Sequence, residues 1–113
     1  MKIAVLIANG SEEIELITPI DILRRAGAIC DVVSVNDITV NCSRGVNIIA
    51  DKLITEICVS EYDGVVIPGG MPGATNISNS ERAIDFIKHL LEQGKMVSSI
   101  CASPAVVLAK HAL

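Results

Sequence analysis

Cys101 is the residue of this chain whose type and position best fit a reactive nucleophile. It directly follows the apolar segment 96–100, and Pro104 marks the first turn of a predicted helix just beyond it. A tight turn from strand to helix exposes the side chain at the turn, as in a nucleophile elbow, although the letters G-x-S-x-G are absent. Unpaired N–H groups at the start of the following helix favour the thiolate over the thiol. We therefore predict a nucleophilic thiol; the competing interpretation is a buried structural cysteine.

Three glutamates follow the first apolar segment, residues 2–8, and one of them is a candidate acid. If a helix begins directly after this segment, Glu12 and Glu15 share one face and Glu13 points elsewhere. A carboxyl group in a desolvated crevice beside a thiolate could stay protonated and act as an acid, which is the role considered for Glu15. Glutamates in a first helical turn also stabilise the helix dipole while facing water. That simpler interpretation is favoured for Glu12 and Glu13 and is equally good for Glu15.

Gly69 and Gly70 follow a third apolar segment, residues 64–68. Without side chains, their backbone can approach a ligand closely, and their N–H groups could bind an oxyanion; the pair could equally form only a tight turn. Neither G-x-x-x-x-G-K-[ST] nor G-x-G-x-x-G occurs, so no phosphate or cofactor site is predicted. No metal-ligand spacing is present. His89 is expected at the surface and His111 without a partner, so neither is predicted to be a catalytic base.

The segments that position these residues alternate between strand and helix patterns. Apolar, β-branched segments predict strands at residues 2–8, 30–35, 64–68 and 96–100. Helical spacing predicts helices from a Ser11 cap to Ala26 and from a Ser78–Glu81 capping box to Gly94, with a small hairpin at 40–42 and 47–49. This alternation predicts an α/β fold with a mainly parallel sheet and helices on both faces. Because ligands bind outside the carboxyl ends of such strands, the ends that lead to Glu15, Gly69 and Cys101 can converge at one crevice.

The composition fits one α/β domain over residues 1–113 and excludes some partners. Half of the residues are hydrophobic, the net charge is −4, and the basic residues are scattered, which argues against nucleic acid as a partner. The longest apolar stretch, Ile3 to Ala8, is too short to span a membrane, and no export signal is visible, so we expect a cytoplasmic protein. The four cysteines lack C-x-x-C spacing. Cys30 and Cys58 are predicted to be buried and reduced, whereas Cys42 lies in a turn that could expose it.

Four sequence blocks, taken together, resemble the signature of the ThiJ/PfpI superfamily. The blocks are residues 8–15 (ANGSEEIE), 42–46 (CSRGV), 62–70 (YDGVVIPGG) and 100–105 (ICASPA). They follow the family's order along the whole chain and are most similar to the branch that contains the Parkinson-disease-associated redox protein. The resemblance implies a flavodoxin-like three-layer sandwich, usually assembled as a homodimer.

The resemblance also implies roles for individual residues. It makes Cys101 the nucleophile and oxidation sensor, and Glu15 the buried glutamate that hydrogen-bonds the cysteine sulfur. The backbone N–H groups of Gly70 and Ala102 would form an oxyanion pocket. Arg44 matches a residue near the site that can reach it across a dimer. Ala102 stands where peptidase-like members have histidine, which lowers the expectation of peptidase activity.

Members of this family extend well beyond residue 113, with further strands, a closing helix and, in many, a site histidine. We therefore expect residues 1–113 to be the N-terminal portion of such a domain, with the C-terminal portion missing or on a separate chain. The leading hypothesis is a cofactor-free, cysteine-dependent enzyme of the deglycase or glyoxalase III type, acting on methylglyoxal, glyoxal or glycated adducts. The alternative is a redox sensor or chaperone-like stress protein that works through oxidation of Cys101. A role in thiamine (thiazole) biosynthesis is a third.

Overall fold

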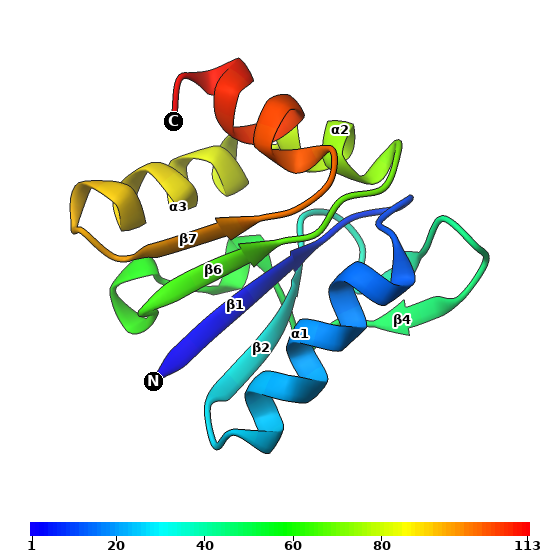
Figure 1. The fold of residues 1–113 in the computed structure, drawn as a ribbon, viewed down its shortest axis with the longest axis horizontal. Coiled ribbons are helices and arrows are strands. Elements are labelled where there is room, and N and C mark those ends of the chain that lie inside the picture. The colour runs from blue at the N-terminus through cyan, green and yellow to red at the C-terminus, as the bar shows by residue number, and fades with distance from the viewer.

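A five-stranded sheet forms the centre of the computed structural model, which describes residues 1–113 (Figure 1). All of its strand pairs are parallel, and the strand order is β5-β2-β1-β6-β7. The strands are β1 (Lys2–Ile7), β2 (Ile29–Ser34), β5 (Lys52–Leu53), β6 (Gly64–Ile67) and β7 (Met96–Ser99). The predicted α/β sandwich with a mainly parallel sheet is thereby confirmed.

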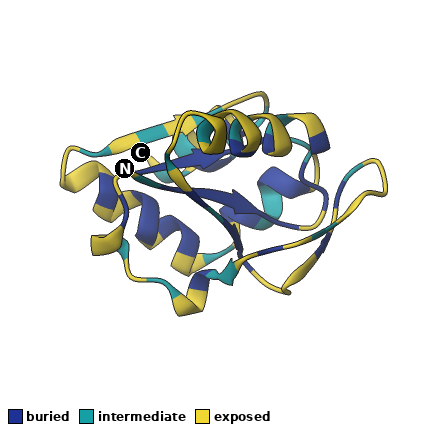
Figure 2. Ribbon diagram, turned by 90° about the horizontal axis from the view of Figure 1, so that it is seen from below, coloured by how far each residue is buried: buried dark blue, intermediate teal, exposed yellow.

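Helices cover both faces of this sheet, so the central strand is buried on both sides (Figure 2). The helices are α1 (Glu13–Arg25) on one face and α2 (Gly73–Ser78) and α3 (Glu81–Glu92) on the other. Alternate residues of β1 divide between the two cores. Ile3, Val5 and Ile7 pack with residues of α1, whereas Ala4 and Leu6 pack with residues of α2 and α3. This two-sided burial explains why the segment is apolar throughout.

The start of α1 differs from the prediction. Its N-cap is Glu12, whose carboxylate accepts a hydrogen bond from the Glu15 backbone N–H at 2.9 Å. Ser11, the predicted cap, instead accepts a hydrogen bond from the Ala8 N–H through its hydroxyl oxygen, at 3.0 Å. Pro19 lies inside α1 without ending it. The helix stops before Gly27, whose φ of +91° lies in the left-handed region that favours glycine after a helix.

The segment around Ser78 also corrects the prediction. Ser80 caps α3 by accepting a hydrogen bond from the Ala83 N–H at 3.2 Å. Ser78 instead lies at the end of α2, a short helix that was not predicted. Its hydroxyl lies 2.9 Å from Nε2 of His111, so this histidine does have a partner, contrary to expectation.

Two small substructures complete the chain. The predicted hairpin is present as the antiparallel pair β3 (Thr39–Asn41) and β4 (Asn47–Ile49). Between β5 and β6 the chain makes two 3-10 turns, η1 (Ile54–Glu56) and η2 (Val59–Glu61), in a segment whose sequence pattern is ambiguous between strand and irregular structure.

None of the helices combines the length and the apolar composition needed to cross a lipid bilayer.

Of the four cysteines, Cys58 contradicts its prediction, and the turn that holds Cys42 does not expose it. Cys30 is buried as expected, but Cys42 is buried too, because the hairpin packs it into the core beside α1. Cys58 is exposed at the start of η2, where its sulfur lies 3.1 Å from the Ser60 hydroxyl. This hydrogen bond lowers the pKa of Cys58. Cys101 is exposed.

Asp31 on β2 is the centre of a charged cluster that holds the sheet to the segment before β6. The Tyr62 hydroxyl donates to Asp31 at 2.6 Å, and the ammonium groups of Lys52 and Lys2 lie 3.2 and 3.8 Å from the same carboxylate. Burial alone would raise the pKa of Asp31, but these neighbours outweigh it and lower the pKa below the ordinary value of 3.8. The cluster therefore stabilises the folded chain when Asp31 is ionised.

Replacing Asp31 with asparagine is expected to destabilise the chain by about 1–2 kcal/mol at pH 7. A carboxyl group with a lowered folded-state pKa contributes its stability above the unfolded-state value, and the contribution is lost as the pH falls through the folded-state value. The difference between wild type and Asp31→Asn in urea denaturation should therefore shrink from pH 7 toward about pH 3. Asp21→Asn, which breaks an exposed ion pair on α1, is the control and should change stability by less than about 0.5 kcal/mol. If Asp31→Asn lowered the free energy of unfolding equally at pH 7 and at pH 3, this account would be contradicted.

Candidate functional site

Cys101 lies on the turn directly after β7, with a φ of +62°. Residues other than glycine rarely adopt this left-handed conformation, so the surrounding structure must hold it in place. Ser103 is part of that support: it is fully buried, and its hydroxyl donates to the Pro68 carbonyl oxygen at 2.5 Å. The helix expected after the turn is a π-helical turn, η3 (Pro104–Leu108), followed by a 3-10 turn, η4 (Ala109–His111). Cys101 is therefore an exposed residue on a strained turn that the buried Ser103 helps to hold in place.

Gly69 lies between Glu15 and Cys101. Its N–H donates to Glu15 Oε1 at 3.0 Å. A β-carbon at Gly69 would lie 2.6 Å from that same oxygen and 2.7 Å from the Cys101 β-carbon, closer than real contacts allow. The carboxyl group of Glu15 and the side chain of Cys101 therefore lie on either side of Gly69, which has no side chain to separate them further. The hydrogen bond from Glu15 to the Cys101 sulfur that the resemblance implies is not formed, since Glu15 accepts from Gly69 instead.

Two backbone N–H groups beside the elbow make no hydrogen bond within the chain. They belong to Gly70 and Ala102, neither of which appears as a donor to any backbone or side-chain acceptor. Gly70 has a φ of +89°, and a β-carbon there would lie 2.6 Å from the Glu12 nitrogen, so only glycine fits. Free N–H groups of this kind can bind a developing oxyanion.

The three glutamates of the first turn of α1 have three different partners. Glu12 caps the helix, and Glu15 accepts from Gly69. Glu13, expected to face water, is instead buried, and its carboxylate accepts from the Ser43 hydroxyl and from the N–H groups of Arg44 and Val46, at 3.1, 2.8 and 3.3 Å. Burial would raise the pKa of Glu13, but these hydrogen bonds outweigh it and lower the pKa. Glu13 thus fastens the hairpin turn to α1.

Arg44 joins this region only through its backbone. Its N–H binds Glu13, but its side chain is exposed and forms no ion pair within the chain. The structure therefore brings Cys101, Glu15 and Gly69 together directly, whereas the Arg44 guanidinium stays at the surface of the hairpin. Sequence reasoning missed Glu13 and Ser103, since both acquire their roles from partners more than 29 residues away.

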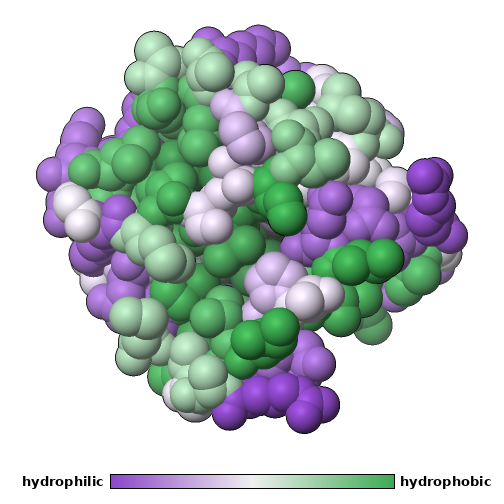
Figure 3. Space-filling view, in the orientation of Figure 1, coloured by the Kyte–Doolittle hydropathy of each residue, from purple (hydrophilic) through white to green (hydrophobic).

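A largely apolar hollow of about 260 Å³ opens beside Glu15, between α1 and β7. Ile14, Pro19 and Ile100 line it, and Ile14 and Ile100 are 72% and 51% exposed. Figure 3 shows hydrophobic side chains gathered in the same region, next to α1 and over β6 and β7. No three or more His, Cys, Asp or Glu side chains are grouped so as to hold a metal ion. The site thus consists of a thiol, a carboxyl group and free N–H groups beside an apolar hollow.

The protein is thus a parallel α/β sandwich that presents a cysteine on a left-handed turn, with a glutamate carboxyl group on the other side of Gly69. The model of the DJ-1/PfpI family matches residues 1–113, and the chain belongs to that family. The fold and the resemblance predicted from the four sequence blocks are therefore confirmed.

Individual relatives agree with this assignment. The chain is 42% identical over 113 residues to Protein DJ-1 homolog B of Arabidopsis thaliana, covering 99% of this chain and 26% of that protein. It is 30% identical over 113 residues to a deglycase of Thermococcus kodakarensis, covering 100% of this chain and 68% of the deglycase. The structure of oxidized Toxoplasma gondii DJ-1 has a TM-score of 0.94 and 50% identity, covering 97% of this chain and 60% of that one. The chain thus spans only part of the length of each relative.

Proposed function

We propose that this protein is a cysteine-dependent, cofactor-free enzyme that acts on small reactive carbonyls or on the adducts they form with amines and thiols. The observation that supports it best is the position of Glu15 Oε1 and the Cys101 side chain on either side of Gly69, beside the free N–H groups of Gly70 and Ala102. The deglycase of Thermococcus kodakarensis, a family relative, supports the substrate class.

Methylglyoxal illustrates the reaction. The Cys101 thiolate attacks the aldehyde carbon, and the carbonyl oxygen takes up a proton to give a hemithioacetal. Glu15 then moves the proton of that carbon to the neighbouring ketone carbon through an enediol, so that one carbon is oxidised and the other reduced without an external oxidant. The N–H groups of Gly70 and Ala102 hold the oxyanion. Water cleaves the resulting thioester, which releases lactate and returns the thiol.

The direct test is to incubate the natively purified protein, with any polypeptide that copurifies, with methylglyoxal and no added cofactor. We expect lactate to form in proportion to the methylglyoxal consumed. Loss of methylglyoxal without lactate would mean that the thiol is only alkylated, and the proposed enzyme activity would be wrong.

Replacing Glu15 with glutamine is expected to lower turnover about 100-fold, because the amide keeps an oxygen for the Gly69 N–H but cannot transfer a proton. Glu12→Gln is the matched control: it removes the same charge from the same helical turn and keeps the capping acceptor. Turnover of Glu12→Gln should stay within about threefold of wild type. Steady-state lactate formation by the three proteins, at equal thermal stability, tests the assignment. Equal turnover by Glu15→Gln and wild type would remove Glu15 from the mechanism.

We also propose that further polypeptide completes the site, as a second copy of the chain and as a C-terminal segment of the same protein. β7 is an edge strand with an unpaired outer side, and Ile14, Met96 and Ile100 are exposed near it. Such an apolar edge favours pairing with another segment. Native mass spectrometry should detect a species heavier than the 11.9 kDa chain. A species of that mass alone at micromolar concentration would contradict the proposal.

A redox role through Cys101 is the second candidate, favoured by the exposure of this thiol and by the oxidized state of the Toxoplasma gondii DJ-1 structure. Exposed thiolates are oxidised by peroxide to sulfenic and then sulfinic acid. Because Cys58 is exposed as well, the experiment uses Cys58→Ser as background. We expect mild peroxide to add two oxygens at Cys101, as found by intact mass and peptide mapping. An unmodified Cys101 would argue against this role.

A further inference from the structure

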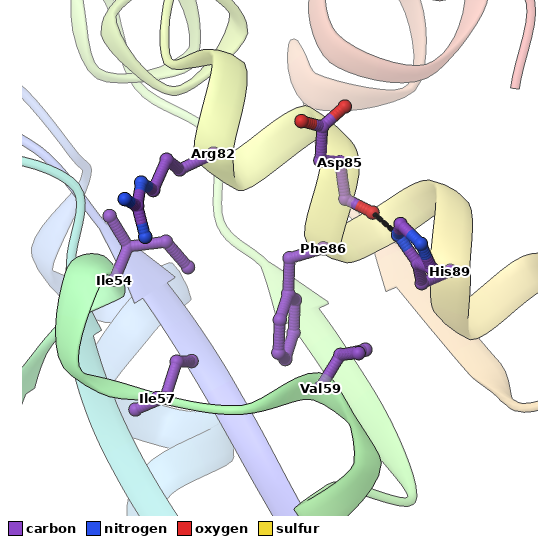
Figure 4. A pocket seen from close by; sticks show the side chains of 7 residues that line it. All are labelled: Ile54, Ile57, Val59, Arg82, Asp85, Phe86 and His89. Carbon is purple, nitrogen blue, oxygen red and sulfur yellow. Dashed lines mark hydrogen bonds between the residues drawn. The ribbon is translucent and has the colours of Figure 1, made fainter.

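A second hollow lies on the sheet face opposite α1, between α3 and the turns η1 and η2, with a volume of about 250 Å³ (Figure 4). We call it the α3 groove. Its floor is apolar and its rim is polar; the lining residues are Ile54, Ile57, Val59, Phe86, Arg82, Asp85 and His89. The first four are hydrophobic, and none of the seven belongs to the site around Cys101.

The floor of the α3 groove is built around one aromatic ring. Phe86 is only 5% exposed, and its ring packs edge-on against Tyr62, with 5.6 Å between ring centroids and an angle of 73°. Figure 4 shows Phe86 pointing toward Ile57 and Val59 across the groove. Because little of the Phe86 ring is exposed, the apolar surface offered to a ligand is shared by Phe86 with the half-buried Ile57 and Val59. An apolar surface of this kind favours a flat apolar or aromatic body on top of it.

The charges on the rim favour an anion. Arg82 takes part in none of the ion pairs of the chain and donates no hydrogen bond to another residue, and its side chain runs toward Ile54 at one end of the groove. The Asp85 carboxylate points away from the apolar side chains. His89 marks the other end, where its Nδ1–H donates to the Asp85 backbone carbonyl at 2.7 Å. The unpaired guanidinium is thus the charged group available to a molecule lying on Phe86.

We propose that the α3 groove binds small arylalkyl carboxylates, with the carboxylate on Arg82 and the ring over Ile57, Val59 and the exposed part of Phe86. Arginine suits this role because its guanidinium fork can bind a carboxylate through two parallel hydrogen bonds. Arg82 and Phe86 are separated by about one helical turn, roughly 6 Å, which a carboxylate joined to a phenyl ring by a short chain can span. For a ligand of this size at an open site, we expect a Kd of about 1 mM.

The chain contains one phenylalanine, so replacing it with 4-fluorophenylalanine gives a single fluorine resonance inside the groove. Titration of the labelled protein with 3-phenylpropionate at pH 7 should produce a saturable shift. Arg82→Gln should raise the Kd at least threefold. Lys88→Gln removes the same charge from an exposed position of the same helix and should leave the Kd unchanged. The Kd of the neutral 3-phenylpropionamide for wild type should be at least threefold higher than that of the acid. The Kd of the amide should be the same for Arg82→Gln as for wild type.

Four results would overturn the proposal. The first is the absence of a saturable shift, and the second is equal affinity of the acid for wild type and Arg82→Gln. The third is equal binding of acid and amide by wild type, which would exclude the arginine contact even if the variant were misfolded. The fourth is a resonance that changes with protein concentration in the absence of ligand, because the groove would then be covered by a second copy of the chain.

Discussion

Cys101→Ser is expected to lower lactate formation from methylglyoxal at least about 1000-fold, since a serine hydroxyl stays protonated at neutral pH and is a much weaker nucleophile than a thiolate. The change is nearly isosteric, and both residues meet the same backbone strain at a φ of +62°. Because the thiol is exposed, the free energy of unfolding should change by less than about 0.5 kcal/mol. Lactate formation and urea denaturation of the same two preparations check both statements.

Cys58→Ser is the matched control for this variant. It removes the other exposed thiol, which lies at η2 and not at the elbow. Its turnover should equal that of wild type. If both variants were as active as wild type, cysteine chemistry would be excluded from the reaction; if both lost activity, the loss could not be assigned to the elbow.

Gly69→Ala is expected to push the Glu15 carboxyl group and the turn that carries Cys101 apart. The added methyl group would overlap Glu15 Oε1 and the Cys101 β-carbon, at 2.6 and 2.7 Å, and would also press on the Ile100 carbonyl oxygen at 3.0 Å. Backbone cannot move aside as a flexible side chain can, so the elbow or α1 must shift. We expect a stability loss of about 1–3 kcal/mol and a fall in turnover of roughly 100-fold. The two losses are measured by urea denaturation and by lactate formation.

Gly64→Ala provides the comparison. Its β-carbon would meet Met96 Cε at 3.0 Å and Ile3 Cδ1 at 3.1 Å, which are the far ends of flexible side chains, and Met96 Cβ at 3.1 Å, which β7 holds in place. We expect Gly64→Ala to lose stability without a comparable loss of turnover in the folded protein. If Gly69→Ala kept wild-type turnover, the proximity of Glu15 and Cys101 would have no catalytic meaning.

The convergence of Glu15, Gly69 and Cys101 could be predicted from the sequence because it depends on a general rule. Apolar segments with glycine or proline at their ends predict parallel strands, and the carboxyl ends of such strands share one edge of the sheet. Local signals sufficed here, since each of these residues lies a few positions beyond its own strand. The same edge predicted free N–H groups at Gly69 and Gly70, but that of Gly69 donates to Glu15. The free N–H group of Ala102 was implied by the family resemblance alone.

Other features could not be predicted because distant contacts decide them. Glu13 looks like a solvent-facing residue until the hairpin, 30 residues away, packs onto it. The same packing buries Cys42. Helix α2 has the sequence GATNIS, which is rich in poor helix formers, and it is stabilised by the burial of Ala74 and Ile77. In each case tertiary packing outweighs the local pattern.

The division of the four cysteines into two exposed and two buried residues turns the native chain into a reporter of its own motions. An alkylating reagent should modify Cys58 and Cys101 quickly, after which further labelling of the folded chain should be slow. Burial raises the pKa of both Cys30 and Cys42, so each reacts only when its surroundings open. Cys42 needs only detachment of the hairpin, whereas Cys30 on β2 needs rupture of the sheet. The number of labels per chain, followed by mass spectrometry over hours, would therefore give the rates of local and of global unfolding separately from one sample.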